Sequence, residues 1–145
     1  MRKEIYTIVD KALSEIVDDN NQRKIKHVDF WNDQIRYVYG EKPFMTPAVF
    51  VEFSPIRWSN LLNGVRESTV EFRLHVVTAN TLGDWKDVIE SLDILEEIHN
   101  TLFGWSKPGE IGTITLIASD TDHDFDELRE DIETYSCHVR TKNIY

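Results

Sequence analysis

The sequence is poor in cysteine, in glycine and in long apolar runs, and each shortage excludes a class of protein. The single cysteine, Cys137, cannot form an internal disulfide or a cysteine-rich zinc site. It lies in an alternating, strand-like segment, which favours a small buried apolar residue over a reactive thiol. The six glycines are scattered, and none belongs to a G-x-G or G-K-[ST] phosphate-binding loop. No apolar run approaches the roughly 20 residues of a membrane-spanning helix, so we expect a soluble protein.

The composition is that of a folded domain. A chain of 145 residues fits one domain, here residues 1–145, and is long enough to bury a core without metal or disulfide support. The content of 41% hydrophobic residues also argues against disorder.

Basic residues are scarce in the second part of the chain. Residues 1–80 hold 11 Lys+Arg and 11 Asp+Glu, whereas residues 81–145 hold 5 and 15 and so supply the whole net charge of −10. Such a surface repels phosphate backbones, so we expect no sequence-specific nucleic-acid binding. Two interpretations stay open: a solvated face that aids solubility, or a surface that lies beside DNA or an acidic partner without adhering.

Two amphipathic helices are predicted from apolar residues at three- and four-residue spacing. The first spans about Arg2 to Asp18 and stops at the turn-forming residues 19–21. The second spans about Gly83 to Phe103, with Thr81 and Asp84 placed as in a capping box. Its predicted core stripe is Trp85, Val88, Ile89, Leu92, Leu95, Ile98, Leu102 and Phe103, and its predicted outer acidic face is Asp84, Asp87, Glu90, Asp93, Glu96 and Glu97.

Four strands are predicted by alternation: Ala48–Ser54, Ser68–Thr78, Ile111–Ser119 and about Asp131–Thr141. In the second of them, Val70, Phe72, Leu74 and Val76 face one way, and Glu71, Arg73 and His75 face water. Residues 22–47 are predicted mostly as loop, with either a short helix ending at Gly40 or an edge strand at Ile25–Phe30. The order predicts an α+β fold, a mostly antiparallel sheet of about four to five strands with two main helices packed on it.

The candidate chemistry is weak. Asp120, Asp122 and Asp124 match the first ligands of an EF-hand calcium loop, but Phe125 stands where glycine is needed and Asp131 where a bidentate Glu is needed. The five histidines, His27, His75, His99, His123 and His138, lack metal-site spacing. We therefore predict no catalytic residue, no cofactor and no metal site.

The segment between the first two strands is more informative. Residues 55–64 form a long excursion whose Asn63-Gly64 pair is a strong turn signal. Large apolar side chains in such a segment either fold back onto the core or become buried in another subunit. The candidate interface residues are Ile56, Trp58, Leu61, Leu62 and Val65.

Three segments, together with the order of elements, carry a family resemblance: Pro47–Phe53, Thr69–Thr78, and the closing acidic loop into Tyr135–Arg140. This pattern, over about residues 1–141, resembles small phage or prophage neck and tail proteins, in particular the tail terminator (tail completion) family of long-tailed phages. The resemblance implies a ring, usually a homo-hexamer, that caps the tail tube and offers the head a docking face. Its partners would be the tail tube protein and the head–tail connector proteins, with no active site and no membrane. The location would be the virion, after assembly in the bacterial cytoplasm.

A ring through which DNA passes benefits from a lumen that repels phosphates. The candidate residues for such an acidic face are Asp87, Glu90, Glu97, Asp122, Asp124 and Asp126. The alternative is a small acidic protein-binding module, an inhibitor or DNA mimic, which has the same charge but forms no ring. A third alternative is a small hydrolase using Cys137 or a histidine, for which the sequence suggests no substrate.

Overall fold

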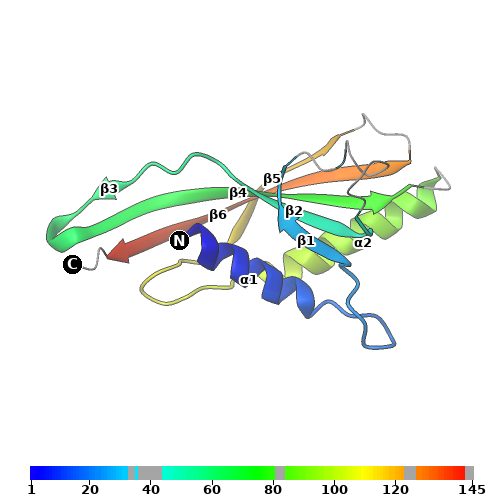
Figure 1. Cartoon of the computed structure of the whole chain (residues 1–145), viewed down its shortest axis with the longest axis horizontal. Coiled ribbons are helices and arrows are strands. Elements are labelled where there is room, and N and C mark those ends of the chain that lie inside the picture. Colours follow the sequence, from blue (N-terminus) through cyan, green and yellow to red (C-terminus); the bar gives the residue numbers. More distant parts are fainter. Residues whose placement is uncertain (33–34, 36–43, 81–83, 123–126, 143–145) are drawn as a thin grey trace.

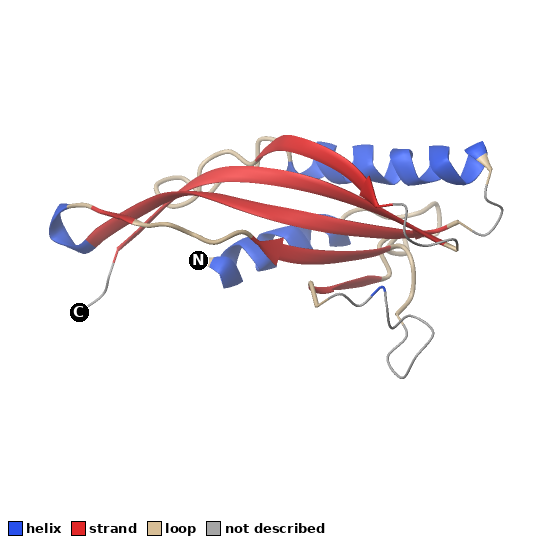
Figure 2. Ribbon diagram, turned by 90° about the horizontal axis from the view of Figure 1, so that it is seen from above, coloured by secondary structure: helices blue, strands red, loops and turns tan. Residues whose placement is uncertain are grey.

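Six strands form one mixed sheet, and both α-helices pack against it (Figures 1 and 2). The computed structural model describes residues 1–32, 35, 44–80, 84–122 and 127–142. The elements, in chain order, are α1 (Arg2–Ser14), β1 (His27–Phe30), β2 (Ala48–Phe53), β3 (Ser59–Asn60), the 3-10 turn η2 (Leu62–Gly64), β4 (Val65–Ala79), α2 (Trp85–Leu102), β5 (Thr115–Asp122) and β6 (Leu128–Lys142). The predicted α+β class is confirmed.

The strands lie in the order β1-β2-β4-β6-β5, and the short β3 pairs with the beginning of β4. All pairs are antiparallel except β1 with β2, where His27 lies beside Ala48 and Phe30 beside Val51. The edge strand considered for Ile25–Phe30 therefore exists over His27–Phe30, and its parallel pairing makes the sheet mixed.

Strands β4 and β6 pair over their full length and form a long ribbon at the centre of the sheet. Its register runs from Val65 opposite Lys142 to Ala79 opposite Leu128, so both strands are longer than predicted. Strand β5 lies later than predicted, because Ile111 and Ile114 are buried in the loop before it. The backbone N–H of Ile111 donates to the carbonyl of Lys107, and the chain becomes regular strand only from Thr115.

Helix α1 ends at Ser14, earlier than the predicted end at Asp18. The Asp18 carboxylate accepts hydrogen bonds from the backbone N–H groups of Asn20 and Gln22, which favours a turn over further helix. Ile16 nevertheless stays buried, so the predicted apolar stripe continues past the end of the helix.

One apolar cluster fills the space between the two helices and the sheet. The predicted inward residues of β4 all belong to it, and Phe72 stacks on Tyr135 of β6 at a centroid distance of 5.7 Å. A second, smaller cluster on the opposite face joins Phe50, Val77 and Leu128 to Ile35. Strand β2 thus carries apolar residues on both faces: Val49 and Val51 in the first cluster, Ala48 and Phe50 in the second.

The prediction for the buried face of α2 is wrong in part. The helix begins after Asp84, whose carboxylate caps the N–H groups of Lys86 and Asp87, while Thr81 and Gly83 lie outside the described residues. The inward face is polar near its start, where the Ser91 hydroxyl lies 2.7 Å from that of Thr78 on β4. This contact lies on the same face as the apolar residues that pack on the sheet. The inward residues are Asp87, Ser91, Leu95, Ile98 and Leu102, and the exposed ones are Trp85, Ile89, Leu92 and Phe103.

Candidate assembly surfaces

A two-stranded arm extends beyond the part of the sheet that the helices cover (Figure 1). We define the arm as residues 57–67 with the paired end of β6, residues 140–142. Its tip is the predicted Asn63-Gly64 turn, in which both residues have positive φ, 62° and 72°. A two-residue turn of this kind matches the twist of the flanking strands, which explains why the chain reverses here.

The five candidate interface residues divide between the tip and the base of the arm. At the tip Leu62 is 87% exposed and Leu61 is 42% exposed, so neither folds back onto the core. At the base Ile56 and Trp58 are partly buried and pack against the main apolar cluster. Val65 is half-buried between the two groups. Folding back onto the core therefore occurs at the base of the excursion, and burial in another subunit stays a prediction for its exposed tip.

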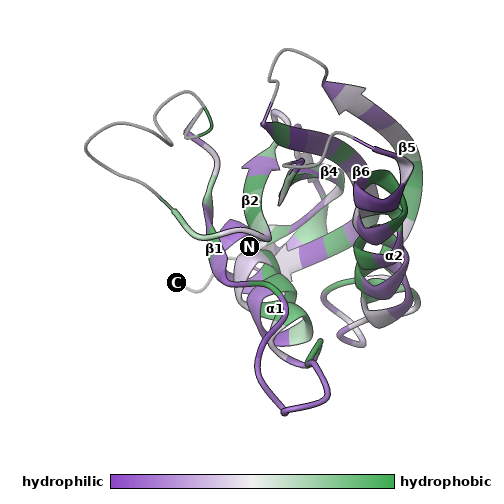
Figure 3. Cartoon of the chain, turned by 90° about the vertical axis from the view of Figure 1, so that its right-hand side faces the viewer, coloured by the Kyte–Doolittle hydropathy of each residue, from purple (hydrophilic) through white to green (hydrophobic). Residues whose placement is uncertain are grey.

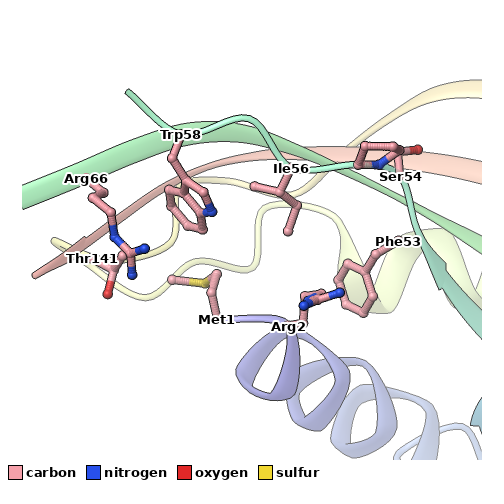
Figure 4. Close-up of a pocket in the computed structure, with 9 residues that line it drawn as sticks. Met1, Arg2, Phe53, Ser54, Ile56, Trp58, Arg66 and Thr141 are labelled. Atoms are coloured by element: carbon pink, nitrogen blue, oxygen red, sulfur yellow. The ribbon is translucent and has the colours of Figure 1, made fainter. Parts of the chain in front are cut away.

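A hollow of about 500 Å³ lies between the base of the arm and the start of α1 (Figure 4). Its apolar lining includes Phe53, Ile56 and Trp58, and its cationic lining consists of Arg2 and Arg66. The Arg66 guanidinium lies over the Trp58 ring, 5.0 Å from its centroid. The Nε of Arg66 is buried and has no hydrogen-bond partner among the described residues. The hollow therefore fits an apolar group that is accompanied by a hydrogen-bond acceptor or an anion.

The arm is basic. Its four cationic side chains stand against one carboxylate, Glu67, which lies 3.2 Å from Arg140 and 3.4 Å from His138. The cationic residues are Arg57, Arg66, Arg140 and Lys142.

The opposite end of the sheet, where α2 starts and β5 ends, is acidic. Figure 3 views the molecule from this end and shows both hydrophilic and hydrophobic residues along α2. The candidate acidic residues are not all outward-facing, however. Glu90 is exposed, but Asp87 is buried beneath the helix, and Glu97 is ion-paired with Lys24 at 2.8 Å. Asp122 is half-buried at the end of β5, and Asp124 and Asp126 lie outside the described residues. Of the predicted outer acidic face of the helix, Asp84, Asp93 and Glu96 are exposed, and Asp120 and Glu127, which were not among the candidates for an acidic face, add to the acidic character of this end.

An exposed apolar stripe lies along the same helix. Trp85 is 69% exposed, and Ile89 and Leu92 follow it at helical spacing on the same side. The predicted apolar spacing is present, but Trp85, Ile89 and Leu92 face outward and not toward the core. Lys86 lies over the Trp85 ring, 5.9 Å from its centroid, and the other charged side chains around the stripe are acidic. An exposed apolar patch with a polar rim is typical of a contact with another protein.

The histidine predicted on the wet face of β4 is buried. His75 is 5% exposed because the Trp31 ring stacks on it at a centroid distance of 3.7 Å. Its Nε2 lies 2.9 Å from Glu52 and its Nδ1 lies 3.3 Å from the buried Glu130. With both ring nitrogens next to carboxylates, the imidazole links β2, β4 and β6. No sequence pattern predicts this cluster, and its one related signal is the presence of aromatic residues within residues 22–47.

The other candidate residues that the structure describes, Asp120, Asp122, Asp131 and Cys137, lie in strands of the sheet. Asp120 and Asp122 lie on extended β5, and Asp131 accepts hydrogen bonds from Arg129 and from the Thr121 hydroxyl. In the parts of the chain that the structure describes, no three His, Cys, Asp or Glu residues are grouped to hold a metal ion. Cys137 is buried, and burial raises the pKa of its thiol to about 11.

The fold has a counterpart among solved structures. A chain in the virion of a native gene transfer agent (GTA) particle matches with a TM-score of 0.51 and 11% identity, over 79% of this chain and 78% of that chain. At this identity the likeness concerns the fold. No family model matches the sequence, and no curated protein does so either. None of the described helices is long and apolar enough to cross a membrane.

Proposed function

We propose that this chain is a structural protein of a phage or phage-like particle, located in the tail or neck of the virion. In the finer form of the proposal it is a tail terminator: a homo-hexameric ring that caps the tail tube and joins it to the head. The observation that carries the proposal is the arm, which exposes Leu61 and Leu62 at its tip and has no described part of its own chain to cover it.

Two further observations support the proposal. The fold is similar to that of a chain from the virion of a gene transfer agent particle. The two ends of the sheet also differ in charge, basic at the arm and acidic at the start of α2. A head-to-tail arrangement of copies brings opposite charges together, and such heterologous contacts generate closed rings when the rotation closes.

The mechanism requires no reacting group. Capping consists of burying surface on the last ring of the tube, which removes the site where the next tube subunit would bind. Acidic residues that line the lumen of the ring would keep DNA from adhering as it passes, because phosphates are repelled by carboxylates. Asp120 and Asp122 on β5 are the described candidates for that lining.

The test is the molar mass of the purified chain by native mass spectrometry, with and without the tail tube protein of the same particle, followed by negative-stain microscopy. We expect a ring of six copies, either alone or on the end of a tube. A chain that stays monomeric in both settings, and leaves tube length unchanged, contradicts the proposal. That result would favour the small acidic binding module.

A further inference from the structure

The chemistry of the hollow at the base of the arm indicates what kind of group would occupy it. It combines an apolar wall, Phe53, Ile56 and Trp58, with the two guanidinium groups of Arg2 and Arg66. Its volume, about 500 Å³, lies within the range of roughly 300–1,000 Å³ that holds a small organic group, so an indole ring fits. The buried Nε of Arg66 additionally lacks an acceptor among the described residues. An aromatic side chain next to a carboxylate matches all three properties.

The chain itself exposes such a group. Trp85 is the first residue of α2 and, at 69%, the most exposed aromatic side chain among the residues that the structure describes. The residue before it, Asp84, is exposed, and the acidic face of the helix begins here. Tryptophan is the residue type most enriched in the energetic centres of interfaces, where it fills a pocket and excludes water.

We propose that Trp85 of one copy of this chain inserts into the arm hollow of the next copy, with the acidic start of α2 against the arginines of the arm. The inference rests on the proposed function, because it names the contact by which the ring would form.

A single chain cannot make this contact. Trp85 and the hollow lie toward opposite ends of the long β4–β6 ribbon, so only a second copy can bring them together (Figure 1). Each copy then offers one end and receives the other, which is a heterologous contact. Charge complementarity favours it, since the cationic residues of the arm meet a helix surface on which carboxylates outnumber the single cation, Lys86, that lies over the Trp85 ring.

The surrounding surface extends the same contact. Beyond Trp85 the exposed stripe of α2 continues to Ile89 and Leu92, and beyond the hollow the arm continues to Leu61 and Leu62. When Trp85 occupies the hollow, these apolar residues are available to bury one another. In this arrangement Glu90 and Asp93 lie at the contact between copies, and Asp120 and Asp122 lie outside it and can line the lumen.

The first test is Trp85→Ala, with Phe103→Ala as the matched control. Both aromatic residues are exposed on the same side of α2, but Phe103 lies at its far end. We expect Trp85→Ala to weaken self-association about thirtyfold, the loss typical of an interface centre, and Phe103→Ala to leave it unchanged. Sedimentation velocity over a concentration series measures both, with circular dichroism to show that each variant is folded. Equal effects of the two substitutions overturn the contact.

The second test locates the contact by cross-linking and leaves Trp85 in place. The double variant carries Lys86→Cys, next to Trp85 in the sequence, and Thr141→Cys, in the lining of the hollow. The native Cys137 is buried and should not react. A short bismaleimide linker should join copies of the double variant into a covalent ladder on a denaturing gel. Each single variant should give mainly monomer, because the contact is not between like sites.

The outcomes separate this inference from the proposed function. A double variant that forms oligomers but gives no ladder overturns the Trp85 contact and leaves the proposed ring standing. A ladder without closed rings, in open filaments, supports the contact and counts against the ring. Cross-linking of Lys86→Cys to a different virion protein in assembled particles, in place of a second copy, also overturns the contact. A chain that is monomeric alone and with the tube protein overturns both.

Discussion

The middle of the β4–β6 ribbon and its arm are made of the same two strands, yet they differ in what covers them. In the middle, Phe72, Tyr135 and Cys137 lie under the helices and are almost completely buried. In the arm, the same ladder continues from Glu67 to Val65, but no helix covers its tip, which is exposed.

The two regions should therefore contribute differently to the stability of the fold and to self-association. A two-stranded ribbon alone is marginally stable in water, so the arm depends on the middle of the sheet for its conformation. The middle in turn gains little from the arm. Substitutions in the middle should therefore change the free energy of unfolding, and substitutions in the arm should change self-association.

The largest effect on unfolding is expected for Phe72→Ala. The ring is fully buried and stacks on Tyr135, so its removal leaves a cavity and should lower the free energy of unfolding by about 4 kcal/mol. Denaturation by urea, followed by circular dichroism, measures the change. Phe72→Leu, which refills most of the space, should lose clearly less. A loss below about 1 kcal/mol for Phe72→Ala would show that the middle is not the stabilising region.

A second large effect is expected on the opposite face of the sheet. His75→Ala removes the partner of Glu130, which is 2% exposed, and a buried carboxylate left without its partner should lower the free energy of unfolding by about 3 kcal/mol. The control is Arg23→Ala, which removes the exposed ion pair between Arg23 and Asp10, apart from the His75 cluster, and should cost below about 1 kcal/mol. Equal losses in the two variants would contradict the structural role given to His75.

Local patterns predicted the middle of the sheet and the turn of the arm. Alternation identified the inward residues of β4, and the Asn63-Gly64 pair identified the reversal, because both signals depend on neighbouring residues alone. The acidic composition after residue 80 was also visible from the sequence. These features needed no knowledge of which elements meet.

The features that the sequence did not predict depend on contacts between residues that lie far apart along the chain. Trp85, Ile89 and Leu92 have the spacing of a core stripe, but the side of α2 that faces the sheet is the one with Leu95, Ile98 and Leu102, where Ser91 also contacts Thr78. His75 sits in an alternating strand, and only the stacking of Trp31 makes it buried. The assembly roles of Ile56, Trp58 and the acidic residues stay predictions.

A smaller effect is expected from a carboxyl group buried under α2. Burial raises the pKa of Glu133, a hydrogen bond from Ser119 opposes the rise, and the charge of Asp131 adds to it. Because the folded-state pKa lies above the ordinary value of 4.5, the ionised carboxylate opposes folding, and stability falls as pH rises through that range. Glu133→Gln should therefore stabilise the protein at neutral pH by less than about 1 kcal/mol.

The pH dependence of that gain identifies its cause. It should vanish below the ordinary Glu pKa, where the carboxyl is protonated in both the folded and the unfolded chain. Thermal unfolding of Glu133→Gln and of the wild type from pH 4 to pH 8 measures it, with the exposed Glu96→Gln as control. A gain that is the same at every pH would assign the effect to packing rather than to charge.

The smallest effect on unfolding, and the most direct test of the comparison, is expected at the arm tip. Leu62 is 87% exposed, so Leu62→Asp should change the free energy of unfolding by less than about 0.5 kcal/mol. The same change places a charge in the surface that we expect another copy to cover, so self-association should weaken at least about tenfold, as desolvating an unpaired charge costs more than 1.4 kcal/mol. Met45→Asp, at an exposed apolar residue outside the arm, should alter neither quantity. If Leu62→Asp instead destabilised the monomer and left association intact, the arm would belong with the middle of the sheet, because its tip would then be covered within its own chain.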